Sequence, residues 1–139
     1  MTGPVEPVVG TAVAAKAGHG VFQVRVESGG YTFQMDEPIA DGGLATGPNP
    51  FDLLRASLAS CTLMTLQAYA KLKGWAFDDL KVRVTHHKST NGVRDRFDRV
   101  IETSNATDEQ RERLLKIALR CPVHLLLEAG ADVTVAMAD

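Results

Sequence analysis

Residues 47–74 read GPNPFDLLRASLASCTLMTLQAYAKLKG and predict one long helix. Asn49 is a favoured N-cap residue, and Pro50 suits the first helical position, where a missing backbone N–H costs nothing. Asp52 in the first turn complements the positive end of the helix dipole. Gly74 supplies the stop, so we expect the helix to run from Pro50 to about residue 73.

This helix is apolar on nearly all of its faces between Leu53 and Leu72, with alanine, serine and threonine filling most of the gaps. A helix with such a pattern is buried on several sides. A chain of 139 residues can hardly wrap one helix completely. We therefore expect a partner chain to cover part of it.

Strand patterns lie before and after the helix. Apolar and polar residues alternate over 22–27 and 31–36 around a Ser-Gly-Gly turn, which predicts a β-hairpin, with another strand near 8–15. The alternation returns over 80–88 and 97–103, and the turn signal Asn91-Gly92 lies between these two segments.

The last third of the chain predicts two helices and a strand. Thr107 and Gln110 form a capping box that opens a helix, and Pro122 starts a short helix over 122–128 that Gly130 closes. Residues 132–137 are typical of a final strand. The predicted order is βββ-α-ββ-α-α-β, an α+β fold in one domain over residues 8–139, after a flexible lead-in at 1–7.

Composition and charge exclude several classes of function. The chain has 15 basic and 17 acidic residues and a formal net charge of −2, so it offers no basic surface for nucleic acid or an anionic membrane. The longest charge-free apolar segment, 56–70, is shorter than the roughly 20 residues of a membrane span. Without an export signal we expect a cytoplasmic protein, in which a cysteine pair is more often catalytic, redox-active or incidental than a structural disulfide.

Two cysteines are the candidate reactive residues. Cys121 precedes Pro122, which predicts that its sulfur lies at a helix N-terminus, where free N–H groups and the helix dipole stabilise a thiolate. His124 lies in the same first turn and can add a charge or a hydrogen bond; alternatively, Cys121 and His124 merely cap helices. Cys61 is in the middle of the long helix and nothing on that helix activates it, so an inert buried cysteine is the commoner outcome. A reactive Cys61 needs a cation from another element or another chain.

The sequence has no motif for a metal or a cofactor. His86 and His87 point to opposite faces of a predicted strand, and His19, His124 and the cysteines lack the close spacing of a zinc site. The glycines before the long helix are not followed by the Lys-Ser or Lys-Thr pair of a phosphate-binding loop. We expect neither a cofactor nor a metal.

Three segments together resemble the OsmC/Ohr family, the osmotically inducible and organic hydroperoxide resistance proteins. They are GPNPFDLL at 47–54, ASCTLMTL at 59–66 and CPVH at 121–124. The predicted element order also matches that family from about residue 8 onward. The chain is most similar to the OsmC-like redox proteins with a Cys-Pro-Val-His segment.

The resemblance implies an intertwined homodimer with the long helices buried between the chains, and a thiol-dependent peroxidase. It implies that Cys61 is the peroxidatic cysteine and Cys121 the resolving one. The Cys61 thiolate would attack an organic hydroperoxide or hydrogen peroxide, and its sulfenic acid would condense with Cys121 to a disulfide. An external dithiol, such as a lipoyl-bearing protein, would then reduce the enzyme.

The chain departs from the hydroperoxide reductases of that family at two places. Those proteins supply a cation from an Arg in the N-terminal hairpin, which is held by a Glu directly after the Asn-Pro pair. Here Phe51 follows that pair and Asp52 comes one position later, so we expect Asp52 as the substitute acid. We expect Arg25 as the substitute cation; the alternatives are Lys16, His19 or no cation at all. The departures leave a second hypothesis open, a non-enzymatic dimer that holds a small ligand in an apolar cleft between its subunits, with unreactive cysteines.

Overall fold

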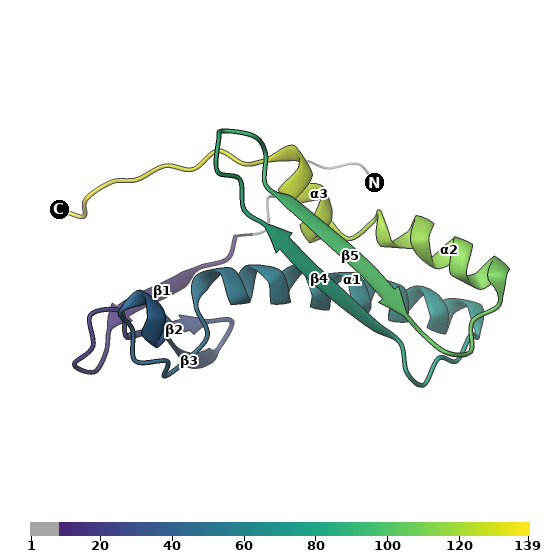
Figure 1. Ribbon diagram of the computed structural model, residues 1–139, viewed down its shortest axis with the longest axis horizontal. Coiled ribbons are helices and arrows are strands. Elements are labelled where there is room, and N and C mark those ends of the chain that lie inside the picture. The colour runs from purple at the N-terminus through teal and green to yellow at the C-terminus, as the bar shows by residue number, and fades with distance from the viewer. Residues whose placement is uncertain (1–8) are drawn as a thin grey trace, which may run out of the picture. The chain divides into compact units, whose positions relative to one another are not determined.

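The computed structural model describes residues 9–139. Their contacts form two compact units, one that extends to Leu53 and one over Leu54–Asp139 (Figure 1). The predicted lead-in at 1–7 lies outside the described residues, and the prediction of a single domain stays a prediction. No helix within 9–139 is long and apolar enough to cross a membrane.

The first unit contains an antiparallel sheet in the order β1-β2-β3, formed by β1 (Ala12–Lys16), β2 (Val24–Ser28) and β3 (Tyr31–Met35). The predicted hairpin is confirmed, because Ser28 pairs with Tyr31 across Gly29 and Gly30. Both glycines have positive φ, at 60° and 82°, which a two-residue hairpin turn requires. A short 3-10 helix, η1 (Ile39–Asp41), follows the sheet.

Helix α1 (Pro50–Lys73) has the bounds that the sequence predicts. Asn49 and Asp52 cap it reciprocally: the Asn49 Oδ1 accepts from the Asp52 backbone N–H at 2.8 Å, and the Asp52 carboxylate accepts from the Asn49 backbone N–H at 3.0 Å. Gly74 follows in the left-handed conformation with φ 70° and ends the helix.

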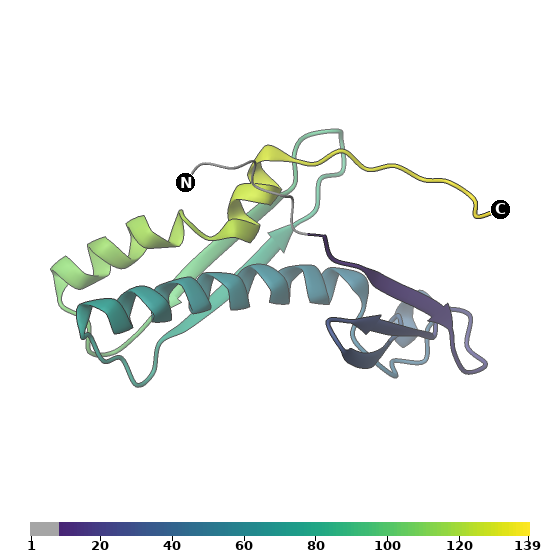
Figure 2. The same cartoon turned by 180° about the vertical axis from the view of Figure 1, so that it is seen from behind.

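The second unit packs a β-hairpin and two further helices against α1. The hairpin joins β4 (Lys81–His87) and β5 (Arg96–Glu102) in antiparallel register. Helix α2 (Asp108–Ala118) opens with the predicted capping box, and α3 (Pro122–Ala129) begins directly after Cys121. The hairpin crosses in front of α1 in Figure 1 and behind it in Figure 2. The buried core joins α1 and α2 and consists of Leu66, Leu114, Ile117 and Ala118, with Tyr69, Phe77, Leu80, Val82 and Ile101 packed against it.

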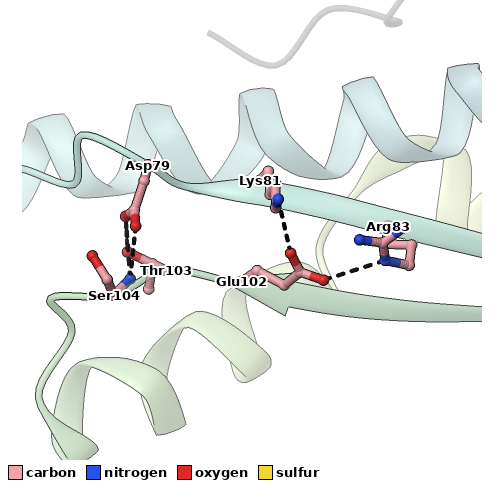
Figure 3. A network of polar contacts seen from close by, with 6 residues as sticks. All are labelled: Asp79, Lys81, Arg83, Glu102, Thr103 and Ser104. Carbon is pink, nitrogen blue, oxygen red and sulfur yellow. Dashed lines mark hydrogen bonds and ion pairs between the residues drawn. The ribbon is translucent and has the colours of Figure 1, made fainter.

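Polar contacts close the end of the hairpin that leads into α2 (Figure 3). The Asp79 carboxylate, before β4, accepts from the backbone N–H of Ser104, after β5, at 3.1 Å. Glu102 on β5 forms ion pairs of 3.2 Å with Lys81 and with Arg83, both on β4. These pairs join opposite strands but are largely exposed, so each contributes little to stability.

One prediction differs from the structure of the single chain. The final strand is absent: residues 132–137 are not in a strand, and Val133 and Val135 are 90% and 97% exposed. A strand needs a neighbour for its backbone hydrogen bonds, and the described strands offer this segment none. One chain buries a single stripe of α1, formed by Leu58, Thr62, Leu66 and Ala70, and the partner chain expected to cover other faces stays a prediction.

Candidate functional site

The two cysteines come together in the second unit, where α1 meets the start of α3. Both are reduced, and Cys121 is completely buried while Cys61 is half-buried. Their side chains lie close enough to shift each other's pKa. The fold thus brings together two thiols that are 60 residues apart in the sequence.

Cys121 has the surroundings of a thiolate. It is the N-cap residue of α3, with Pro122 at the first helical position, as the sequence predicts. Burial raises the pKa of the Cys121 thiol, but the backbone N–H of His124, the Thr62 hydroxyl and the Cys61 thiol act in the opposite direction. These favourable contacts outweigh burial, and the pKa of Cys121 lies below its ordinary value.

Cys61 has the opposite balance. Burial has the largest effect and raises the pKa of its thiol. The Val123 backbone N–H and the Thr65 hydroxyl lower this pKa, but the neighbouring Cys121 raises it, and the pKa of Cys61 lies above its ordinary value. The Thr65 hydroxyl beside it donates to the Cys61 carbonyl oxygen at 2.8 Å. The pKa values of the two thiols thus shift in opposite directions, which favours the thiolate at Cys121 over the thiolate at Cys61.

Arg99 is the residue of the site that the sequence analysis missed. It is half-buried on β5, and its Nη1 donates to the Thr62 hydroxyl at 2.9 Å and to the Ala118 carbonyl at 3.0 Å. Its Nη2 donates to Nδ1 of His124. One signal was available: Arg99 occupies the phase of the strand that Phe97 and Ile101 use to face inward.

His124 links Arg99 to an acidic residue on α3. Its Nε2 lies 2.7 Å from Oε2 of Glu128, one turn further along the helix. Because Arg99 has only donors and a carboxylate only acceptors, the contacts assign the proton of the neutral imidazole to Nε2 and leave Nδ1 as the acceptor. His124 thus does more than cap a helix, since it bridges Arg99 and Glu128.

A cavity of about 190 Å³ lies beside this network. Its wall combines apolar and charged side chains: Leu58, Phe97, Leu127, Arg94, Asp95, Arg96, Arg99, His124 and Glu128. Arg94 is fixed there by donating to the Glu128 backbone carbonyl at 2.7 Å. A small molecule with an apolar body and a polar end would fit such a wall.

The other predicted site residues belong to the first unit. Arg25 lies on β2, opposite Ala15 and Gln34, and Asp52 caps the start of α1. Lys16 ends β1 and His19 follows it. Their roles as cation and acid remain predictions.

The histidines of β4 face opposite ways, as expected. The side chain of His86 is 1% exposed and contacts Asp95, whereas that of His87 is 48% exposed and contacts Asp98. Among residues 9–139 no group of three or more His, Cys, Asp or Glu side chains lies together in a way that could hold a metal ion.

The element order and the paired cysteines define an α+β fold of the OsmC type, with a three-stranded and a two-stranded antiparallel sheet. The chain belongs to the OsmC family: the family profile described as OsmC-like protein matches residues 41–136. A search of curated protein sequences finds no match.

Solved structures are similar over most of the chain. An OsmC-like protein from Mycoplasma pneumoniae is 26% identical with a TM-score of 0.65, and the match covers 89% of each chain. A Psychrobacter arcticus protein, named for an osmotic stress and detoxification response, is 20% identical with a TM-score of 0.70 over 87% of this chain and 90% of that one. The organic hydroperoxide resistance protein OhrB of Bacillus subtilis is 23% identical with a TM-score of 0.58 over 85% and 89%.

Proposed function

We propose that this chain is a thiol-dependent peroxidase that reduces organic hydroperoxides, and hydrogen peroxide as a smaller substrate, with Cys61 and Cys121 as its redox pair. The observation that carries the proposal is the pair of neighbouring reduced thiols, one of which has a lowered pKa. The names of related structures, among them organic hydroperoxide resistance proteins, support the choice of substrate class.

Cys61 is proposed as the attacking residue, because it is half-buried whereas Cys121 is fully buried. The Cys121 thiolate first accepts the proton of the Cys61 thiol. The Cys61 thiolate then attacks the distal oxygen of the hydroperoxide, the O–O bond breaks, and the leaving alkoxide takes the proton from Cys121 as it departs as an alcohol. The products of this step are a Cys61 sulfenic acid and a regenerated Cys121 thiolate.

The second step closes the cycle. The Cys121 thiolate attacks the sulfur of the Cys61 sulfenic acid, hydroxide leaves and is protonated by solvent to water, and a disulfide forms. An external dithiol, such as a lipoyl group on another protein, reduces that disulfide by thiol exchange. Arg25 and Asp52 are proposed as the cation and the acid of the reaction.

A homodimer is part of the proposal. Met64 and Leu72 on α1 are 66% and 82% exposed in the single chain, and the apolar segment around Val133 and Val135 is exposed as well. A second copy that covers these side chains would remove apolar surface from water.

Peroxide turnover by cysteine variants tests the function. Purified protein, cumene hydroperoxide and excess dihydrolipoamide are mixed, and the remaining peroxide is measured against time. We expect turnover by the parent, none by Cys61→Ser, and about one equivalent consumed by Cys121→Ser before Cys61 is overoxidised. Ser60→Ala, an exposed neighbour on the same helix, is the matched control and keeps full turnover. Full activity in both cysteine variants would contradict the two-cysteine mechanism.

A further inference from the structure

Arg99 is a half-buried cation whose contacts are all with neutral groups. Its acceptors are the Thr62 hydroxyl, the Ala118 carbonyl and the His124 imidazole, and in the described part of the chain none of them is a carboxylate. Two other arginines of this hairpin differ, since Arg83 pairs with Glu102 and Arg96 pairs with Asp98. Removing a guanidinium from water without a carboxylate partner raises the free energy of the folded state, unless another negative charge lies nearby.

Thr62 connects this cation to the cysteine pair. Its side chain is completely buried, its oxygen accepts from Arg99, and its hydroxyl also acts on Cys121 in the direction that favours the thiolate. The same hydroxyl has the Leu58 carbonyl as a second acceptor, at 2.7 Å. A donor from a charged group polarises the O–H bond, so Arg99 makes Thr62 a stronger donor toward Cys121.

The position of Arg99 depends on α3, the helix that also carries Cys121. His124 presents Nδ1 to Arg99 because Glu128 holds its Nε2–H at 2.7 Å. One helix thus provides both the cysteine and the anchor of the cation. Besides the two cysteines, the charged and titratable groups that the described contacts and the adjoining cavity wall place here are Arg94, Asp95, Arg96, Arg99, His124 and Glu128.

We propose that Arg99 is the positioning residue of the cysteine pair: its guanidinium, held by His124 and Glu128, acts through the Thr62 hydroxyl and keeps the negative charge of the pair on Cys121. The inference deepens the proposed function and rests on it for the peroxide step. It adds a second cation to the proposal, because Arg99 of the second unit is assigned to Cys121, whereas Arg25 is proposed for the reaction at Cys61.

The test titrates the thiolate directly, in protein that carries Cys61→Ser so that Cys121 is the only thiol. Absorbance at 240 nm is followed against pH for this parent and for Arg99→Gln. We expect Arg99→Gln to raise the apparent pKa of Cys121 by about one unit, a tenfold loss of thiolate at a fixed pH below it. Arg99→Lys keeps the positive charge but cannot make the same three hydrogen bonds, so the apparent pKa of Cys121 in this variant should lie between those in the parent and in Arg99→Gln.

Arg83→Gln is the matched control. It removes one arginine from the neighbouring strand, where Arg83 is 64% exposed and bound to Glu102 (Figure 3), and it should leave the titration of Cys121 unchanged. The same titration in folded Arg99→Gln and parent would overturn the proposal, as would an equal shift in Arg83→Gln.

A second pair of variants keeps the test decisive if Arg99→Gln does not fold. His124→Asn places an amide oxygen near the position of Nδ1 and should titrate like the parent. His124→Phe offers Arg99 no acceptor and should raise the apparent pKa of Cys121; equal titration of these two variants overturns the proposal. The thiolate titration needs no peroxide, so it tests Arg99 independently of the proposed function. If Arg99→Gln shifts the pKa of Cys121 but the native chain shows no peroxide turnover, the role of Arg99 stands and the proposed peroxidase activity is rejected.

Discussion

Replacing Thr62 by valine measures what the hydroxyl at the centre of the site contributes to stability. The side chain is fully buried, accepts from Arg99 at 2.9 Å and donates to the Leu58 carbonyl at 2.7 Å. Valine has nearly the same shape, so the change removes the hydrogen bonds and leaves the packing. Leu58 retains its backbone hydrogen bond within α1, whereas an N–H of Arg99 loses its acceptor. A hydrogen bond to a charged group contributes about 1.5–3 kcal/mol, and we expect the free energy of unfolding to fall by about 2 kcal/mol.

Thr62→Ser is the control for that measurement. It keeps the hydroxyl and loses one methyl group, for which we expect a cost of about 0.8 kcal/mol. Urea unfolding of the parent and both variants, followed by far-ultraviolet circular dichroism at one protomer concentration, gives the free energies. Thr62→Val as stable as the parent, or more stable than Thr62→Ser, would refute the assignment of a buried hydrogen bond to Arg99.

Three further predictions concern the core, the charge of the pair and the assembly. Leu66→Ala, at a fully buried position of α1, should cost about 3 kcal/mol in urea unfolding, whereas Leu115→Ala, at a 62% exposed position of α2, should cost under about 1 kcal/mol; equal effects would contradict the assigned core. Titration of the native protein at 240 nm should show one thiol with a pKa below the ordinary thiol value and one with a pKa above it. As the pH falls, the Cys61 thiolate is then protonated first and the Cys121 thiolate last. Two thiols that both titrate at the ordinary pKa would contradict the opposite shifts of the two cysteines. Light scattering should give twice the 15.0 kDa chain mass for the parent and one chain mass for Met64→Asp; a monomeric parent would contradict the homodimer.

Elements with local signals were predictable from the sequence. The bounds of α1 follow from Asn49 and Gly74, because a cap and a left-handed glycine depend on neighbouring residues alone. The capping box at Thr107 and the placement of Cys121 at the start of α3 are confirmed for the same reason.

Features that depend on distant residues were not predictable. The alternation in 132–137 is typical of a strand, but a pattern does not provide the neighbour that a strand needs, and the described chain has none there. The apolar faces of α1 are real, yet one chain covers only the stripe through Leu66. Arg99 lies where β5, α1 and α3 come together in the fold. The spacing of residues in the sequence does not predict which elements come together there, so the contacts of Arg99 were not predictable.

The central claim is that Cys61 and Cys121 act as one redox pair, and intact mass after oxidation tests it most directly. The reduced protein is treated with one equivalent of cumene hydroperoxide per chain, after which free thiols are counted and the denatured chain is weighed. The account predicts that both thiols are lost and that each chain becomes about 2 Da lighter, as disulfide formation requires. Two unreacted thiols at unchanged mass would contradict it and favour the non-enzymatic dimer that binds a small ligand.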